Sequence, residues 1–144
     1  MSLPDLPEAS GLAASRAHPA VLWSIGDSGP PEILALDRKG ATQSRVTIAG
    51  AQVHDWEDVA VGPCAQGSCV YVADIGDNRK SRRHITIYRV PEPSPGDSTS
   101  RPAEALHATY PDGPHDAESI FVTSSGDLFL VTKEAPANVY RFPQ

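Results

Sequence analysis

Two short segments of the chain, HDWED and HDAES, place carboxylates at a spacing that suits cation binding. Side chains at positions i and i+2 of a β-strand point the same way, so Asp55 is expected to point with Glu57, and Asp116 with Glu118. Carboxylates crowded in this way repel one another unless they are protonated or share a cation. A set of hard oxygen ligands suits Ca²⁺. The spacing therefore predicts a cation site, with Ca²⁺ as the expected ion.

A local explanation fits these carboxylates equally well. Asp and Glu often accept backbone N–H bonds where a chain turns into a strand, without binding any metal. His54 and His115 fall on the alternate face and are predicted to be loop or packing residues, although a softer metal would recruit them. If a cation is bound, Asp55 or Asp116 is the candidate general base for hydrolysis of a substrate polarised by that ion.

A second group of polar residues lies in loops that begin with IGDS, IGDN and TKEA. Gly-Asp-Ser and Gly-Asp-Asn are ordinary tight-turn sequences, so turn formation is one role for them and extra oxygen ligands are the other. The RKSRRH segment concentrates positive charge, which suits a phosphate or carboxylate group but also an ordinary solvated loop. Lys133 is either an anion contact or a rim salt-bridge residue. The candidate ligand-binding residues are Asp27, Asp74, Asp77, Asn78, Arg82, Arg83 and Lys133.

The elements that must position these residues are β-strands. Short runs rich in β-branched and aromatic residues, such as CVYVAD, HITIYRV and DLFLVT, recur between clusters of Gly, Pro, Asp and Ser. This pattern predicts an all-β fold with hardly any helix. The Pro-rich segment 91–104 is expected to be a long polar loop between two strands.

The strands follow a threefold internal repeat. EASGLAAS, DWEDVAVG and DAESIFVT each begin with an acidic residue and are followed by a turn, an apolar strand, a polar loop and another strand. The repeat length is close to the ~40–50 residues of a β-propeller blade. Glu8 takes the place of Asp55 and Asp116, which completes the predicted metal ligands: Glu8, Asp55, Glu57, Asp116 and Glu118.

The repeat predicts one domain, 1–144, made of propeller blades at about 8–50, 51–111 and 112–144. Four-stranded antiparallel blades are expected, with the third lacking its fourth strand. Since strands alternate in direction, the loops before each first strand and the loops between second and third strands should open on the same face. The candidate residues would then gather at the mouth of a central channel.

The two cysteines, Cys64 and Cys69, flank a short turn between apolar runs, where a hairpin would bring them to bridging distance. A disulfide there would imply an oxidising compartment. The alternative is two free thiols in a cytosolic loop. The predicted location is secreted or periplasmic, because a disulfide forms there. The first ten residues of the sequence lack the basic and apolar regions of a signal peptide.

The composition of the 144 residues limits the partners. A formal net charge of −6 argues against nucleic-acid and membrane-surface partners, because both are anionic. No segment approaches the ~20 apolar residues of a membrane-spanning helix, so a soluble protein is expected.

The motifs DWEDVAVG, DIGDN and PDGPHDAES together resemble a family of uncharacterised, mostly secreted bacterial β-propeller proteins. The resemblance covers essentially the whole chain and implies further blades after the third. A looser similarity of architecture links the chain to calcium-dependent lactonase and phytase-type propellers. It implies a fold and says little about the reaction.

Three functions remain open. The first is a non-enzymatic propeller that binds a small molecule or protein on its loop face, with a structural cation. The second is a calcium-dependent hydrolase of a lactone or phosphoester, and the third is a fragment without activity of its own. Three blades cannot close a ring of the ~4–8 that propellers use, so the sequence predicts either missing C-terminal blades or a homodimer that completes six.

Overall fold

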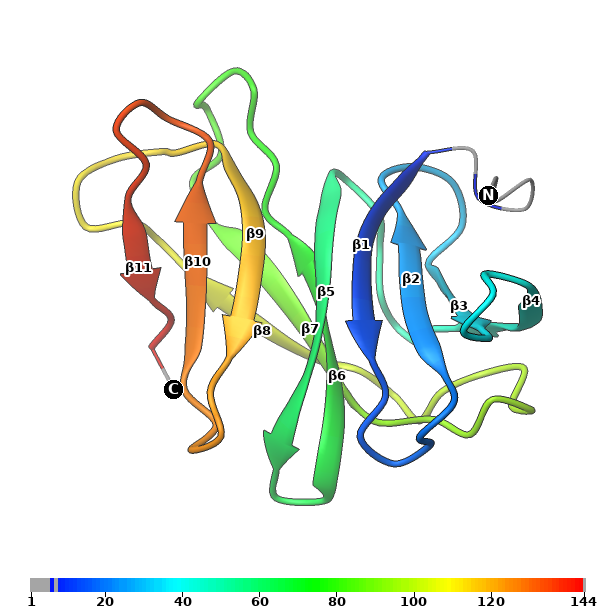
Figure 1. Ribbon diagram of the computed structural model, residues 1–144. Coiled ribbons are helices and arrows are strands. Elements are labelled where there is room, and N and C mark those ends of the chain that lie inside the picture. The colour runs from blue at the N-terminus through cyan, green and yellow to red at the C-terminus, as the bar shows by residue number, and fades with distance from the viewer. Residues whose placement is uncertain (1–5, 7, 144) are drawn as a thin grey trace.

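The computed structural model of the chain describes residues 6 and 8–143, and in this part all regular elements are β-strands (Figure 1). The all-β prediction is therefore confirmed. None of the described residues forms a helix long and apolar enough to cross a membrane. The strands are β1 (Ala9–Ala14), β2 (Leu22–Gly26), β3 (Glu32–Leu36), β4 (Thr42–Thr47), β5 (Trp56–Cys64), β6 (Gly67–Asp74), β7 (Ile85–Pro91), β8 (Glu104–Ala108), β9 (Ala117–Val122), β10 (Leu128–Thr132) and β11 (Val139–Arg141).

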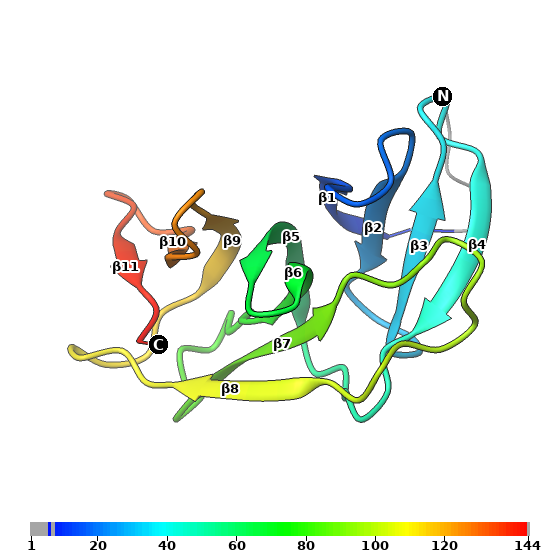
Figure 2. The same cartoon turned by 90° about the horizontal axis from the view of Figure 1, so that it is seen from below.

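The strands form three antiparallel sheets, in the orders β1-β2-β3-β4, β5-β6-β7-β8 and β11-β10-β9. Within each sheet, consecutive strands are neighbours, as expected when short turns join them. The three sheets fan out from β1, β5 and β9, which lie side by side at the inner end of the fan (Figure 2). The first strands of all three predicted units are thus close together in space.

Two hydrophobic cores hold the sheets together. Trp23 and Trp56 are fully buried in the core between the first and second sheets. Tyr71 and Leu130 belong to the core between the second and third sheets. Because apolar side chains alternate along β6, this strand supplies both cores: Val70 faces the first and Tyr71 the second.

Close backbone approach between first strands depends on small residues. A Cβ added at Gly11 would lie 2.7 Å from Asp58 Oδ1, and one added at Gly62 would lie 2.3 Å from Val122 Cγ1. Asp58 also bridges the second and third sheets, since its Oδ2 accepts a hydrogen bond of 2.8 Å from the backbone N–H of Ile120. These contacts fix β1, β5 and β9 against one another.

The loops separate onto two faces, as predicted. The β6–β7 and β10–β11 loops and the segments before β5 and β9 lie at one end of the fan, called here the loop face (Figure 1). The β5–β6 hairpin lies at the opposite end and carries the disulfide Cys64–Cys69, with 5.8 Å between the Cα atoms. The predicted disulfide is therefore confirmed. Gly67, with φ of 101°, closes the hairpin in a conformation that L-residues rarely adopt.

The Pro-rich segment between β7 and β8 lies along the edge of the first sheet. Thr47 of β4 donates its N–H to Ser98 O at 3.0 Å and accepts the N–H of Ser100 at 2.8 Å. The Ala103 N–H reaches Ala49 O at 2.8 Å. These bonds satisfy backbone groups that an open edge strand would leave exposed to another chain. The segment is therefore a structural tie between the first and second sheets as well as a loop.

Candidate functional site

Each first strand carries an irregularity where it leaves the loop face. The pairing register shifts between Ala9 and Gly11 in β1 and between Trp56 and Asp58 in β5, and β9 shows a shift at the matching place. An extra residue in one strand forms a β-bulge, which changes the direction in which the side chain at that position points. Such bulges are frequent next to functional sites. The residues at the shifts are Ser10, Glu57 and Glu118.

The carboxylates of Asp55 and Glu57 both lie against a glycine of the β6–β7 loop, Gly76. A Cβ added at Gly76 would lie 2.4 Å from both Asp55 Oδ2 and Glu57 Oε1. The N–H groups of Ile75 and Gly76 each donate to Asp55 O at 3.2 Å, which holds the loop in this place. Any larger residue at position 76 would displace the two carboxylates.

The electrostatics of Glu57 show that carboxylates of the second and third sheets are crowded. Burial and, after it, the charges of Glu118, Asp55 and Asp116 together raise the pKa of Glu57 to about 7, against the opposing charge of Lys133. The pKa of Asp55 is also raised, first by burial and then by the charge of Asp116. Glu57 thus interacts electrostatically with three of the other four predicted metal ligands.

The third-sheet carboxylates already have protein partners. Asp116 is buried, and its Oδ1 accepts the Asp77 N–H at 2.8 Å. Glu118 Oε1 forms an ion pair of 2.8 Å with Lys133 Nζ. Among the described residues, no three or more His, Cys, Asp or Glu side chains are already gathered closely enough to hold a metal ion. The oxygen-rich set has the chemistry that Ca²⁺ prefers, and full coordination needs the carboxylates to converge.

Glu8 and Asp27 lie by the first sheet. Glu8 Oε2 accepts a hydrogen bond of 2.8 Å from Ser28 Oγ. Asp27 Oδ1 is buried without a hydrogen-bond partner among the described residues, and the charge of Asp27 contributes to the raised pKa of Asp55. The β2–β3 loop thus offers one buried carboxylate oxygen without a hydrogen-bond partner in the part of the chain that the structure describes.

Most polar residues of the β6–β7 loop stabilise the loop itself. Asp77 accepts the N–H groups of Ser81 at 3.0 Å and Arg82 at 2.7 Å. Arg82 pairs with the buried Asp74 at 2.6 Å and donates to Gly76 O at 3.0 Å. Asn78 and Arg83, by contrast, are exposed.

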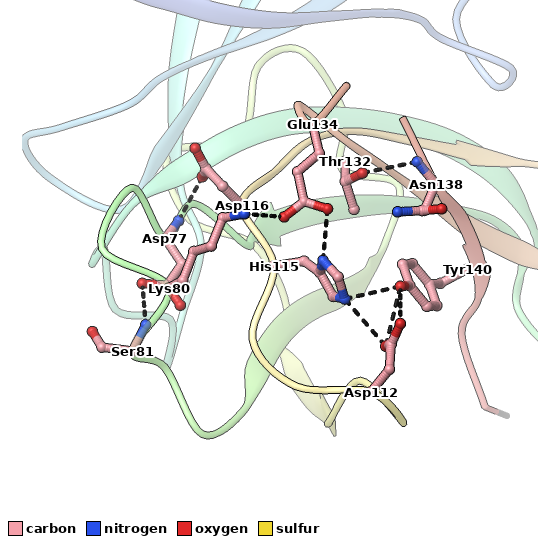
Figure 3. Close-up of polar contacts among 10 residues, drawn as sticks. All are labelled: Asp77, Lys80, Ser81, Asp112, His115, Asp116, Thr132, Glu134, Asn138 and Tyr140. Carbon is pink, nitrogen blue, oxygen red and sulfur yellow. Dashed lines mark hydrogen bonds and ion pairs between the residues drawn. The ribbon is translucent and has the colours of Figure 1, made fainter. Parts of the chain in front are cut away.

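A hydrogen-bonded network around His115, which was not predicted from the sequence, lies beside Asp116 (Figure 3). His115 Nδ1 lies 2.8 Å from Glu134 Oε2, and His115 Nε2 lies 3.1 Å from Asp112 Oδ1. Tyr140 Oη donates to Asp112 Oδ2 at 2.8 Å, and Lys80 Nζ pairs with Glu134 Oε1 at 2.5 Å. Burial lowers the pKa of His115, but its hydrogen bonds with Glu134 and Asp112 outweigh burial and raise it. The network ties the β6–β7, β8–β9 and β10–β11 loops together.

Two hollows on the loop face flank the β6–β7 loop. One has a volume of about 400 Å³ and the other about 260 Å³. The larger is lined by residues that include Asp55, Gly76, Asn78, Arg79 and Arg82. The smaller is lined by residues that include Arg82, Arg83, His84, Tyr110 and His115. Both hollows combine basic side chains with nearby carboxylates, so they suit a polar ligand better than an apolar one.

Comparisons of this chain with protein-family models, with curated proteins and with solved structures find no match.

Proposed function

We propose that the chain is a β-propeller module that binds a ligand on its loop face, with a cation held at the channel mouth by Asp55, Glu57, Asp116 and Glu118. The observation that carries the proposal is the close approach of the Asp55 and Glu57 carboxylates at Gly76, where burial and then the charges of neighbouring carboxylates raise the pKa of Glu57 to about 7. A divalent cation would offset this repulsion and stabilise the ionised form of all four groups.

The propeller assignment draws support from the arrangement of the sheets. Three meandering sheets fan out from three adjacent first strands, as blades do around a channel. Membership of the secreted bacterial propeller family that the sequence resembles is part of the same proposal. The Cys64–Cys69 disulfide is compatible with an extracellular or periplasmic location.

The proposed ligand carries a phosphate or carboxylate group. Arg79 lines the hollow beside Asp55, and the exposed Arg83 lines the other hollow. A guanidinium forms bidentate hydrogen bonds with either group, and a cation at the carboxylates would attract the same anion. Arg82 is a weaker candidate because Asp74 already binds it.

A calcium-dependent hydrolase is the second candidate, favoured by one observation. A carboxyl group with a pKa of about 7, as at Glu57, can both accept and donate a proton near neutral pH. Of the two general bases predicted from the sequence, Asp116 already accepts a hydrogen bond from the Asp77 N–H. Asp55 is therefore the better candidate for the general base. Turnover of a lactone or phosphoester with Ca²⁺ present, lost in Asp55→Asn, would establish this activity.

Thermal unfolding with added Ca²⁺, Mn²⁺ or Zn²⁺ tests the cation site. A ligand that binds only the folded state adds about 2.7 kcal/mol at 100 times its Kd, so Tm should rise by several degrees with the preferred ion. Glu57→Gln should abolish most of this rise. The same variant should unfold at a higher temperature than the wild type without cation, because it removes like-charge repulsion.

Two glycine variants provide an independent test. Gly76→Ala should weaken the cation response at least tenfold in apparent affinity, because the new methyl displaces both carboxylates. Gly96→Ala is the matched control, since an added Cβ there meets nothing within 4 Å. No change in Tm with any of the ions, or an undiminished change in Glu57→Gln, would refute the site.

A further inference from the structure

Two histidine side chains meet on adjacent strands of the second sheet. His84 is the residue before β7, and His107 lies in β8. The centroids of their rings are 5.3 Å apart, and the ring planes are nearly perpendicular, at 84°. Both residues are exposed. Neither belongs to the carboxylates of the candidate site or to the network around His115, so the pair is a separate set of candidate metal ligands.

The pairing of β7 with β8 explains why the two rings meet. Thr86 lies directly opposite His107 in this antiparallel pair. His84 precedes Thr86 by two residues, and side chains two residues apart in an extended chain point to the same face. His84 is therefore the diagonal neighbour of His107, which is within reach of an aromatic side chain.

A hydrogen bond orients the ring of His107. Its Nδ1 lies 3.1 Å from the hydroxyl oxygen of Thr86, which is buried. A metal-binding histidine typically has its second ring nitrogen in such a hydrogen bond, which fixes the ring and leaves the other nitrogen for the metal. In His107 the nitrogen left for a metal is Nε2. In the part of the chain that the structure describes, neither ring nitrogen of His84 has a hydrogen bond, so His84 also has a nitrogen available.

The distance between the two rings matches that of two imidazoles bound to one tetrahedral metal ion. With a Zn–N distance of ~2.0–2.1 Å, each ring centre lies ~3.2 Å from the ion, and two ring centres then lie ~5.2 Å apart. The observed distance between the ring centroids is 5.3 Å. The strands therefore need not move for both rings to bind one ion, and only the rings need to turn about their side-chain bonds.

We propose that His84 and His107 together bind one Zn²⁺ ion, at a site that shares no ligand with the proposed carboxylate site. Imidazole nitrogens suit Zn²⁺, whereas Ca²⁺ prefers oxygen ligands. Two protein ligands leave about two positions of a tetrahedral ion open. His84 also lines the smaller hollow of the loop face, so a ligand in that hollow can occupy an open position. The exposed Arg83 lines the same hollow, and its positive charge favours an anionic group there.

Calorimetric titration of the full chain with Zn²⁺ at neutral pH tests the site. His84→Gln and His107→Gln should each weaken Zn²⁺ binding at least tenfold, because each removes one of two protein ligands. His18→Gln, in the turn between β1 and β2, is the matched control and should bind Zn²⁺ as the wild type does. Circular dichroism of each variant checks that the sheets are retained.

Thr86→Val tests the role of the hydrogen bond, since it keeps both imidazoles and nearly the same side-chain shape. Loss of a hydrogen bond to a metal-binding histidine typically weakens metal binding about 10–100-fold, so Thr86→Val should weaken Zn²⁺ binding by at least tenfold. With Cu²⁺ in place of Zn²⁺, electron paramagnetic resonance should show two nitrogen ligands in the wild type and one in His107→Gln.

Glu57→Gln separates this site from the proposed carboxylate site. The variant should lose the response to Ca²⁺ but keep the binding of Zn²⁺ by the histidine pair. Zn²⁺ binding that is lost in Glu57→Gln and undiminished in both histidine variants would place the ion at the carboxylates, which would overturn this inference and leave the proposed function intact. Absence of Zn²⁺ binding in the wild type, or its loss in His115→Gln with no effect of His84→Gln, would also overturn it.

Discussion

Glu92 is a single carboxylate that connects two sheets far from the candidate site. It accepts hydrogen bonds from Trp23 Nε1 at 2.9 Å, from the Ala17 N–H at 3.2 Å, from Ser68 Oγ at 2.6 Å and from Ser15 Oγ. Burial raises the pKa of Glu92, but the hydrogen bonds from Ser15, Ser68 and Trp23 outweigh burial and lower it. The ionised carboxylate therefore stabilises the junction between the first and second sheets.

Replacing Glu92 with Gln should destabilise the protein by about 1–3 kcal/mol at pH 7, because an amide cannot accept all four hydrogen bonds. The pKa of Glu92 is lower in the folded than in the unfolded state. Its contribution is therefore present above the unfolded pKa of about 4.3 and is lost as the pH falls through the folded pKa. Urea unfolding at several pH values should show this difference between the wild type and Glu92→Gln.

Glu104→Gln is the control for Glu92, since Glu104 forms an exposed ion pair of 2.6 Å with Arg89. Exposed pairs contribute less than about 1 kcal/mol, so this variant should behave nearly as the wild type. Equal stability of Glu92→Gln and the wild type at pH 7 would show that the four contacts carry no net energy.

At the scale of elements, close packing of β5 against β9 sets the positions of Glu57 and Glu118. Gly62 makes this possible, because its missing side chain leaves room for Val122. Gly62→Ala should cost about 1–3 kcal/mol through overpacking, measured by urea unfolding. Val122→Ala in the same chain should recover much of the loss, because the two residues are in contact and their effects are not additive. Additive losses in the double variant would contradict this account of the interface.

The strands could be predicted from the sequence because their signals are local. Alternating apolar residues and intervening turns predicted the strands CVYVAD and HITIYRV, which correspond to β6 and β7. The Asp-x-Glu spacing also predicted that Asp55 would lie with Glu57. Contacts between sheets were not predictable from spacing, because they join residues far apart in the sequence. Asp58 reaches Ile120, and Glu92 reaches Ser15, over distances along the chain that no short motif contains.

In the candidate site, too, features that depend on local spacing were predictable, and contacts between distant segments were not. The carboxylates of the second and third sheets were predicted to converge, and the charges that raise the pKa of Glu57 include three of them. The partners that hold Asp116 and Arg82 depend on how the β6–β7 loop folds back. The network of His115 with Glu134 likewise needs two loops to meet, which the sequence does not reveal.

At the scale of the whole molecule, the fan places the acidic residues at the start of β5 and β9 on the loop face. The chain has a formal net charge of −6, and part of this charge is concentrated where the second and third sheets meet.

Anomalous diffraction from crystals grown with Ca²⁺ tests the proposed cation site most directly. The site predicts one anomalous peak per chain, about 2.3–2.6 Å from carboxylate oxygens of Glu57 and Asp116, with Asp55 or Glu118 also in contact. The peak should be absent from crystals of Glu57→Gln grown under the same conditions. Wild-type crystals with Ca²⁺ but no peak near these carboxylates, or with a peak only at other surface groups, would contradict the proposed function.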